Sequence, residues 1–231
     1  MKKNLIFTII GVVLIVVGIV AFVLPSKGNN SANGNNNGKD VEPEKISVDI
    51  NDETVQELFS IFKLDGDRCR YIIIPWLNDS NQAKLAVAYD NLAEGEIKDI
   101  PCTNIKDYDG NACGEGAPIV NTEYVEVDVL KTKFYELFSS KFTFNAETFY
   151  SAAGRRMYFD NKQQIFAGFN EYMDGGCTNY SSQEITSAYK QGDNLYIETR
   201  AVTVTDQLDV VIKYEFVKEN GRYVFSSVTE I

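Results

Sequence analysis

The chain of 231 residues is 44% hydrophobic and carries 33 acidic against 22 basic side chains, a formal net charge of −11. This charge argues against nucleic acid and anionic membrane surfaces as partners and favours cations and basic surfaces, unless the acidity serves only solubility. The chain contains no histidine, which excludes Ser-His-Asp and Cys-His catalysis as well as zinc sites built on histidine.

The N-terminal part of the chain is strongly apolar. Residues 5–24 include one polar side chain and no charge, and as a helix they would cover about 30 Å, the hydrocarbon thickness of a bilayer. No small-x-small cleavage site and no lipid-accepting cysteine follows this run. We therefore predict an uncleaved transmembrane helix, a signal-anchor, over residues 5–24. Because Lys2 and Lys3 precede it, residues 1–4 are expected in the cytoplasm, and the single-pass chain continues extracytoplasmically.

Residues 25–45 contain the run SKGNNSANGNNNGKD, which is rich in Asn, Gly and Ser. Such a segment has too few apolar side chains to order itself, and it predicts a flexible tether. The remaining residues, 46–231, are enough for one domain with its own core. Two smaller lobes, a helical one over 46–140 and a β-rich one over 141–231, are the alternative.

Three short amphipathic helices are expected in the first half of this domain. Their predicted spans are 52–62, from 79 or 80 to 94, and 128–139, and Asn51 or Asp52 is available as the first N-cap. Their apolar faces comprise Val55, Leu58, Phe59 and Phe62; Leu85, Ala88, Tyr89 and Leu92; and Leu130, Phe134, Leu137 and Phe138. A strand-like YIII run lies at residues 71–74.

Beyond the third helix the apolar period changes from 3.6 to 2, which is typical of strands. Three hairpins are expected, namely RRMYF with QQIFAGF, EITSAYK with LYIETRAVTV, and DVVIKYEFV with RYVFSSV. In the last hairpin, Asn220-Gly221 supplies the positive φ angles of a tight turn. The sequence therefore predicts an α+β fold with three helices and a C-terminal antiparallel sheet of about six strands.

The order of these parts, together with the segment VEVDVLKTKFYELF, resembles uncharacterised signal-anchored exported proteins of low-GC Gram-positive bacteria. The C-terminal strands with the helix before them are similar to NTF2-like cone folds. The first resemblance implies no activity and no functional residue. The second implies a fold that hosts both enzymes and binding modules.

The stretch KDYDGNACGEG, residues 106–116, concentrates acids and glycines. The oxygen ligands that it could offer a metal are Asp107, Asp109, Asn111 and Glu115. An EF-hand is excluded because Ala112 stands where that loop requires glycine and Pro118 where it requires glutamate. We predict a structural loop without metal or cofactor, and a non-EF oxygen site is the alternative.

Four cysteines, Cys69, Cys102, Cys113 and Cys177, allow three pairings. On the exported side of a membrane we predict two disulfides, Cys102 with Cys113 around the acidic turn and Cys69 with Cys177 between the helical part and the sheet. Free thiols and a different pairing are alternatives. No CxxC motif occurs, so neither a thioredoxin-type site nor a paired-knuckle zinc site is indicated.

These features favour a non-enzymatic, membrane-tethered module that binds a protein or a cell-wall ligand at the cell surface. The alternative is a carboxylate-based hydrolase of envelope polymers, which would need two acids about 5 to 10 Å apart in a pocket, one with a raised pKa. A thiol-based envelope redox protein is a third hypothesis, which unreactive oxidised cysteines would contradict. The sequence itself assigns no catalytic residue.

Overall fold

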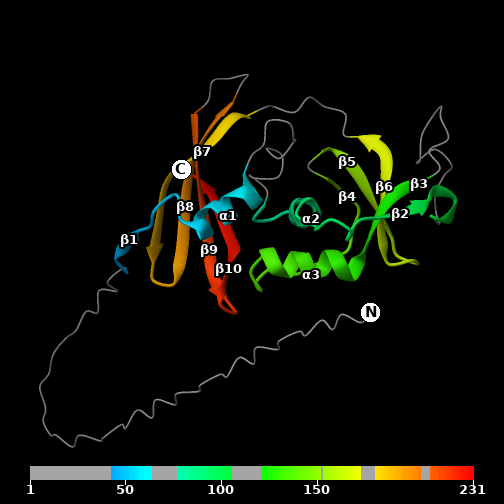
Figure 1. The fold of residues 1–231 in the computed structure, drawn as a ribbon, viewed down its shortest axis with the longest axis horizontal. Coiled ribbons are helices and arrows are strands. Elements are labelled where there is room, and N and C mark those ends of the chain that lie inside the picture. The colour runs from blue at the N-terminus through cyan, green and yellow to red at the C-terminus, as the bar shows by residue number, and fades with distance from the viewer. Residues whose placement is uncertain (1–42, 64–76, 106–120, 152, 173–179, 204–208) are drawn as a thin grey trace, which may run out of the picture. The chain divides into compact units, whose positions relative to one another are not determined.

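The computed structural model describes residues 43–63, 77–105, 121–151, 153–172, 180–203 and 209–231. In these residues, ten strands form two antiparallel sheets of five strands each, and there are three α-helices (Figure 1). Residues 42–231 make up one compact unit.

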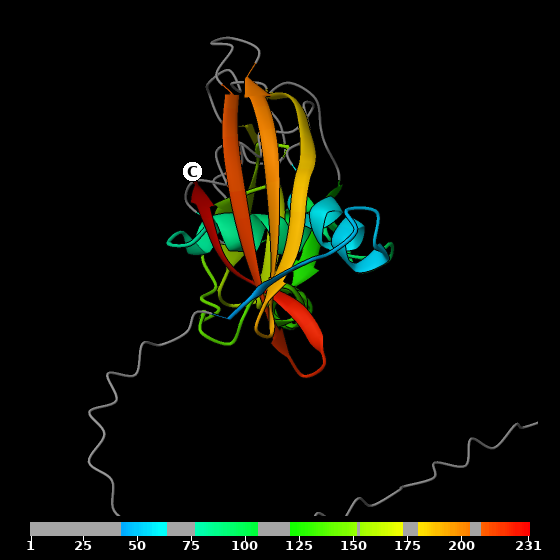
Figure 2. The same cartoon turned by 90° about the vertical axis from the view of Figure 1, so that its left-hand side faces the viewer.

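Sheet A has the strand order β1–β7–β8–β9–β10, and its strands lie side by side in Figure 2. The strands are β1 (Lys45–Ser47), β7 (Tyr180–Gln191), β8 (Asn194–Thr203), β9 (Asp209–Glu219) and β10 (Arg222–Glu230). The hairpins β7–β8 and β9–β10 confirm the second and third hairpin predictions. Asn220 and Gly221 have φ angles of 50° and 84°, the left-handed conformation that a two-residue hairpin turn requires.

Sheet B has the strand order β2–β3–β6–β5–β4. Its strands are β2 (Lys98–Pro101), β3 (Asn121–Glu126), β4 (Phe149–Tyr150), β5 (Arg155–Asp160) and β6 (Ile165–Tyr172). The hairpin β5–β6 confirms the first predicted hairpin. Its second strand also pairs with β3, where Val125 lies opposite Phe166.

Helix α1 (Glu53–Phe62) begins where its capping chemistry predicts. The carboxylate of Asp52 accepts a hydrogen bond of 2.9 Å from the amide of Thr54 and so satisfies one of the free N–H groups of the first turn. The side chains Val55, Leu58 and Phe62 are buried, as their helical spacing predicts.

The other two helices differ in how they are enclosed. Helix α2 (Asn81–Asp90) has Ser80 as its N-cap, and every residue from Ala83 to Tyr89 is buried, so the prediction of a single apolar face was too narrow. Helix α3 (Val127–Leu137) follows β3 without a loop and buries its apolar stripe.

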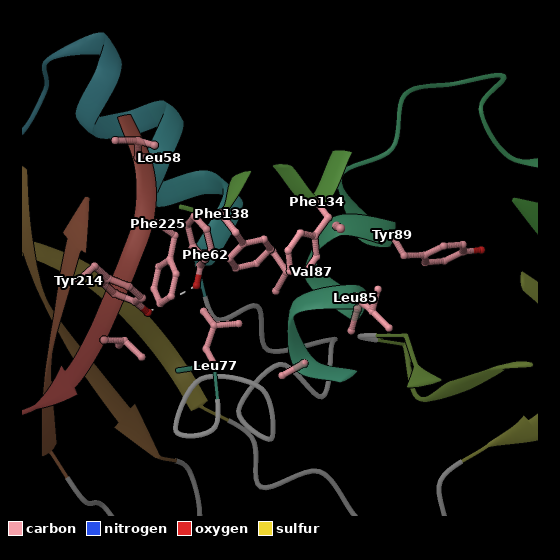
Figure 3. Close-up of a cluster of buried hydrophobic side chains, with 14 of the residues drawn as sticks. Leu58, Phe62, Leu77, Leu85, Val87, Tyr89, Phe134, Phe138, Tyr214 and Phe225 are labelled. Atoms are coloured by element: carbon pink, nitrogen blue, oxygen red, sulfur yellow. Dashed lines mark hydrogen bonds between the residues drawn. The ribbon is translucent and has the colours of Figure 1, made fainter. Parts of the chain in front are cut away.

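A cluster of aromatic side chains joins α1, α3 and sheet A (Figure 3). The ring of Phe62 lies 5.0 Å from the ring of Phe225 and 6.0 Å from that of Phe138, between ring centroids. The same core includes Phe149 and Phe166 of sheet B. Both sheets therefore share one apolar core.

The predicted fold class was wrong in its sheet. The three C-terminal hairpins do not form one six-stranded, NTF2-like sheet, because the β5–β6 hairpin belongs to sheet B and the other two belong to sheet A. The chain is also richer in strands than predicted, since β1, β2, β3 and β4 were missed. The choice of partner strand depends on contacts between distant segments, and periodicity reports only the local conformation.

The predicted membrane-spanning helix and signal-anchor have no support in the structure. Within the described residues, no helix is both long and apolar enough to cross a bilayer. The sequence run that led to the prediction, residues 5–24, lies outside the described residues, as does nearly all of the predicted tether.

Candidate binding groove

A groove of about 600 Å³ opens between α1, α3 and the turn end of the β9–β10 hairpin. This volume lies within the range of small-ligand and peptide-anchoring pockets. Its lining residues are Thr54, Glu57, Leu58, Ile61, Phe62, Asn91, Lys133, Glu136, Leu137, Lys218, Gly221, Arg222 and Tyr223. We call it the α1–α3 groove.

The floor of the groove is apolar. Leu58 and Phe62 are buried side chains of the core, and Ile61, Leu137 and Tyr223 are partly buried beside them. Leu58, Ile61 and Phe62 recur at helical spacing on α1. One face of this helix therefore supplies both core contacts and part of the groove floor. A ligand with an aliphatic or aromatic group could therefore bury it here.

The walls of the groove carry charges from three elements. The ammonium group of Lys133 pairs with the carboxylate of Glu136 at 2.8 Å on α3. Glu57 contributes a carboxylate from α1, and Lys218 and Arg222 contribute two cations from the β9–β10 hairpin.

The position of Arg222 is fixed by the end of α3. Its guanidinium donates a hydrogen bond of 2.9 Å to the carbonyl oxygen of Tyr135 in the last helical turn. A cation at this end of a helix interacts favourably with the helix dipole. The hydrogen bond therefore attaches the hairpin to α3 and holds one side of the groove.

Glu219, beside the hairpin turn, is directed to the chain after α3. Its carboxylate accepts hydrogen bonds from the Ser139 hydroxyl at 2.6 Å and from the Ser140 amide at 3.0 Å. The Ser139 bond, followed by the Ser140 amide, lowers the pKa of this carboxyl, and partial desolvation opposes the shift. Glu219 thus connects the β9–β10 hairpin to the residues that follow α3.

The groove bears on the hydrolase hypothesis because it brings two glutamates, Glu57 and Glu136, to one cavity. Glu136, however, forms an ion pair with Lys133 on the same helix, at 2.8 Å. This arrangement suits binding better than proton transfer.

A second polar arrangement lies in sheet B. The guanidinium of Arg155 contacts the carboxylate of Glu123 at 2.5 Å, the hydroxyl of Thr122 at 2.8 Å and the carbonyl of Phe169 at 3.1 Å. A Cβ on Gly168 would lie 2.7 Å from the guanidinium carbon, so glycine makes room for the flat group. All its nitrogen atoms have protein partners, which indicates a structural role.

The same network includes the buried phenol of Tyr89. Burial, and then the charge of Glu123 and its hydrogen bond to the phenol, raise the pKa of Tyr89, whereas Arg155 opposes the shift. Tyr89 therefore stays protonated and donates to Glu123, which links α2 to sheet B.

A third polar arrangement surrounds Lys84, which is only 4% exposed. Its ammonium group donates to the carbonyl oxygens of Asn78 at 3.0 Å and Ser80 at 3.2 Å and lies 4.5 Å from the centroid of the Phe142 ring. Burial lowers the pKa of Lys84 to about 8; the charge of Asp79 opposes this shift and Lys141 adds to it.

A fourth arrangement lies on sheet A, around two glutamates. Glu198 accepts hydrogen bonds from Ser187 at 2.8 Å and Tyr189 at 3.4 Å. Glu215 accepts from Asn194 at 2.9 Å, Tyr196 at 3.1 Å and Ser227 at 2.7 Å. The rings of Tyr189 and Tyr196 stack on each other at 5.0 Å. The polar groups of these side chains form hydrogen bonds with one another across neighbouring strands, which is typical of cross-strand stabilisation of a sheet.

The metal candidates predicted from the sequence, Asp107, Asp109, Asn111 and Glu115, all lie outside the described residues. Within the part of the chain that the structure describes, no group of three or more Cys, Asp or Glu side chains is placed to hold a metal ion.

The described residues do not test which cysteines pair in the predicted disulfides. Cys102 is buried in a 3₁₀ turn, Cys102–Asn104, and is disulfide-bonded. The other three, Cys69, Cys113 and Cys177, lie outside the described residues, so no disulfide between two described cysteines is seen.

Sequence reasoning missed the groove. Its residues come from segments far apart in the chain, and helical spacing identified Leu58 and Phe62 only as core positions. The one local signal was the pattern Lys218, Arg222 and Tyr223, which places two cations and a tyrosine around a tight turn.

No protein-family model, no curated protein and no solved structure matches this chain.

Proposed function

We propose that the domain is a non-enzymatic binding module that takes a peptide segment of a protein partner in the α1–α3 groove. The observation that carries this proposal is the combination of a volume of about 600 Å³ with an apolar floor and charged walls. Burial of apolar side chains supplies affinity, and peripheral charges supply specificity.

The groove suits an extended or helical peptide better than a small metabolite, because it is lined by two helices and a hairpin end. Recognition of a peptide in a groove between helices uses a few apolar anchors at regular spacing. Leu58, Ile61 and Leu137 provide the surface for such anchors.

The experiment is a selection of random 12-residue peptides on the full-length chain, followed by affinity measurements on the enriched peptides. Thr54 is exposed and lines the groove, so Thr54→Trp should fill it and weaken peptide binding at least tenfold. Ser60→Trp is the matched control, since Ser60 is exposed on the same helix and does not line the groove. This variant should bind the peptides as tightly as the wild type does.

Circular dichroism and melting temperature verify that both variants are folded. The proposal fails if no peptide is enriched over an uncoated surface, or if the enriched peptides bind the Thr54→Trp variant as tightly as the wild type.

A further inference from the structure

We infer that the partner of the α1–α3 groove is an acidic peptide segment. Its carboxylates would bind at the hairpin end of the groove, and a large apolar side chain next to them would pack on the floor. This inference rests on the proposed function, because it specifies the ligand of the same groove.

Three cations lie at the hairpin end. The ammonium groups of Lys190 and Lys218 each lie 5.9 Å from the centroid of the Tyr223 ring. At this distance a cation–π contact is weak. Arg222 lines the groove together with Lys218, whereas Lys190 is not among the lining residues. None of the three cations forms an ion pair with a residue that the structure describes.

The carboxylates nearby are engaged elsewhere. Glu219 accepts hydrogen bonds from Ser139 and Ser140, and Glu136 pairs with Lys133 on α3. Of the two carboxylates that line the groove, Glu57 on α1 is the one without an ion-pair partner among the described residues. Glu219 keeps its negative charge, because its partners are a hydroxyl and an amide. The three cations outnumber it, so the hairpin end carries a positive charge in a chain whose net charge is −11.

This local reversal of charge decides the sign of the ligand. A positive surface attracts a complementary anion and repels basic segments, whereas the overall negative charge repels long polyanions such as nucleic acid. A short acidic segment meets both conditions. The apolar floor beside the cations requires that the segment also carry a leucine- or phenylalanine-sized side chain.

The test uses three fluorescein-labelled 12-residue peptides, in which Leu and Phe alternate with Glu, with Gln or with Lys. Fluorescence anisotropy with the full-length chain should show the Glu peptide binding at least tenfold more tightly than the Gln peptide, and the Lys peptide binding most weakly. Raising the salt from 50 to 300 mM should weaken the Glu peptide most, because its contacts are screened.

The charge-reversed variant is Lys190→Glu with Lys218→Glu. These lysines are chosen, and Arg222 is left intact, because the Arg222 hydrogen bond to Tyr135 supports the fold. Affinity for the Glu peptide should fall at least tenfold. The matched control reverses two exposed lysines that neither line the groove nor lie at the Tyr223 ring, Lys131→Glu with Lys162→Glu, and should change the affinity less than twofold.

The possible failures are distinguishable. If the Gln or Lys peptide binds as tightly as the Glu peptide, and Thr54→Trp still removes this binding, the inference is wrong and the proposed function stands. A fourth peptide, with phosphoserine in place of Glu, separates two kinds of anion: if it binds tightly and the Glu peptide does not, the carboxylate ligand is wrong. If no peptide binds in a manner sensitive to Thr54→Trp, the proposed function fails as well.

Discussion

Lys84 is a cationic side chain in a nearly closed environment, and its contacts explain how the fold tolerates it. Two backbone carbonyls and the face of Phe142 take the place of water around the ammonium group. The lowered pKa shows that these contacts offset only part of the cost of burial.

We predict that stability rises with pH because of Lys84. Its pKa is about 8 in the folded protein and 10.5 in its unperturbed form, so between these values the unfolded chain binds more protons and the free energy of unfolding increases with pH. From pH 7.5 to 9.5 the gain should be on the order of 1–2 kcal/mol. Urea denaturation of the wild type and of Lys84→Met measures it.

The difference between these two proteins isolates the contribution of Lys84, because all other titrating groups are shared. The range stops at pH 9.5 because the raised pKa of Tyr89 has the opposite effect: once the tyrosine of the unfolded chain ionises, stability falls with pH. Equal pH dependence in the wild type and Lys84→Met would contradict the prediction.

At the scale of elements, β10 is an edge strand of sheet A. Residues outside the sheet form hydrogen bonds with the backbone groups on its outer side. The side chain of Asn78 donates to the carbonyl of Val228 at 2.7 Å and accepts from its amide at 2.9 Å, so it acts as a backbone group would. Farther along, the amide of Ser139 donates to the carbonyl of Phe225. The backbone groups of Val228 and the carbonyl of Phe225 are therefore not free to pair with another chain.

We expect Asn78→Ala to destabilise the protein by about 2 kcal/mol, because both polar groups of Val228 lose their partner in a partly buried place. Amide exchange at Val228 should become faster in the same variant. Asn145→Ala is the control: Asn145 is exposed, so the change should stay within about 0.5 kcal/mol. Protection at Val228 that survives Asn78→Ala would show that the side chain is dispensable.

At the scale of the whole molecule, the two sheets are coupled through one core. Phe138 follows α3, is 1% exposed and lies 5.7 Å from Phe225 of sheet A and 5.0 Å from Phe134, between ring centroids. Residues of sheet B belong to the same buried cluster. A core shared in this way should unfold as one cooperative unit.

Phe138→Ala should therefore lower the free energy of unfolding by about 3–5 kcal/mol, the usual cost of truncating a buried phenylalanine. Far-ultraviolet circular dichroism and tyrosine fluorescence should still report one coincident transition, at a lower urea concentration. Phe138→Leu, which leaves a smaller cavity, should cost less. Two separated transitions in either variant would show that the sheets unfold independently.

The sequence by itself determined the local features of the described residues. Asp52, one of the two predicted caps, begins the first helix, and Ser80, one of the two predicted start residues, caps the second, because a side-chain oxygen beside the first helical turn satisfies a free amide. Asn220-Gly221 forms the predicted turn because few other residues tolerate positive φ. Such signals depend only on neighbouring residues.

The tertiary structure alone decided which strands pair and where the candidate site lies. The β5–β6 hairpin joins sheet B because β6 pairs with β3, a segment well upstream in the chain, and no local pattern in the sequence encodes that partner. The α1–α3 groove exists only because the core brings Phe62 of α1 against Phe225 of β10. Apolar burial favours compact packing without direction, so the partner of each face emerges from the packing of the whole unit.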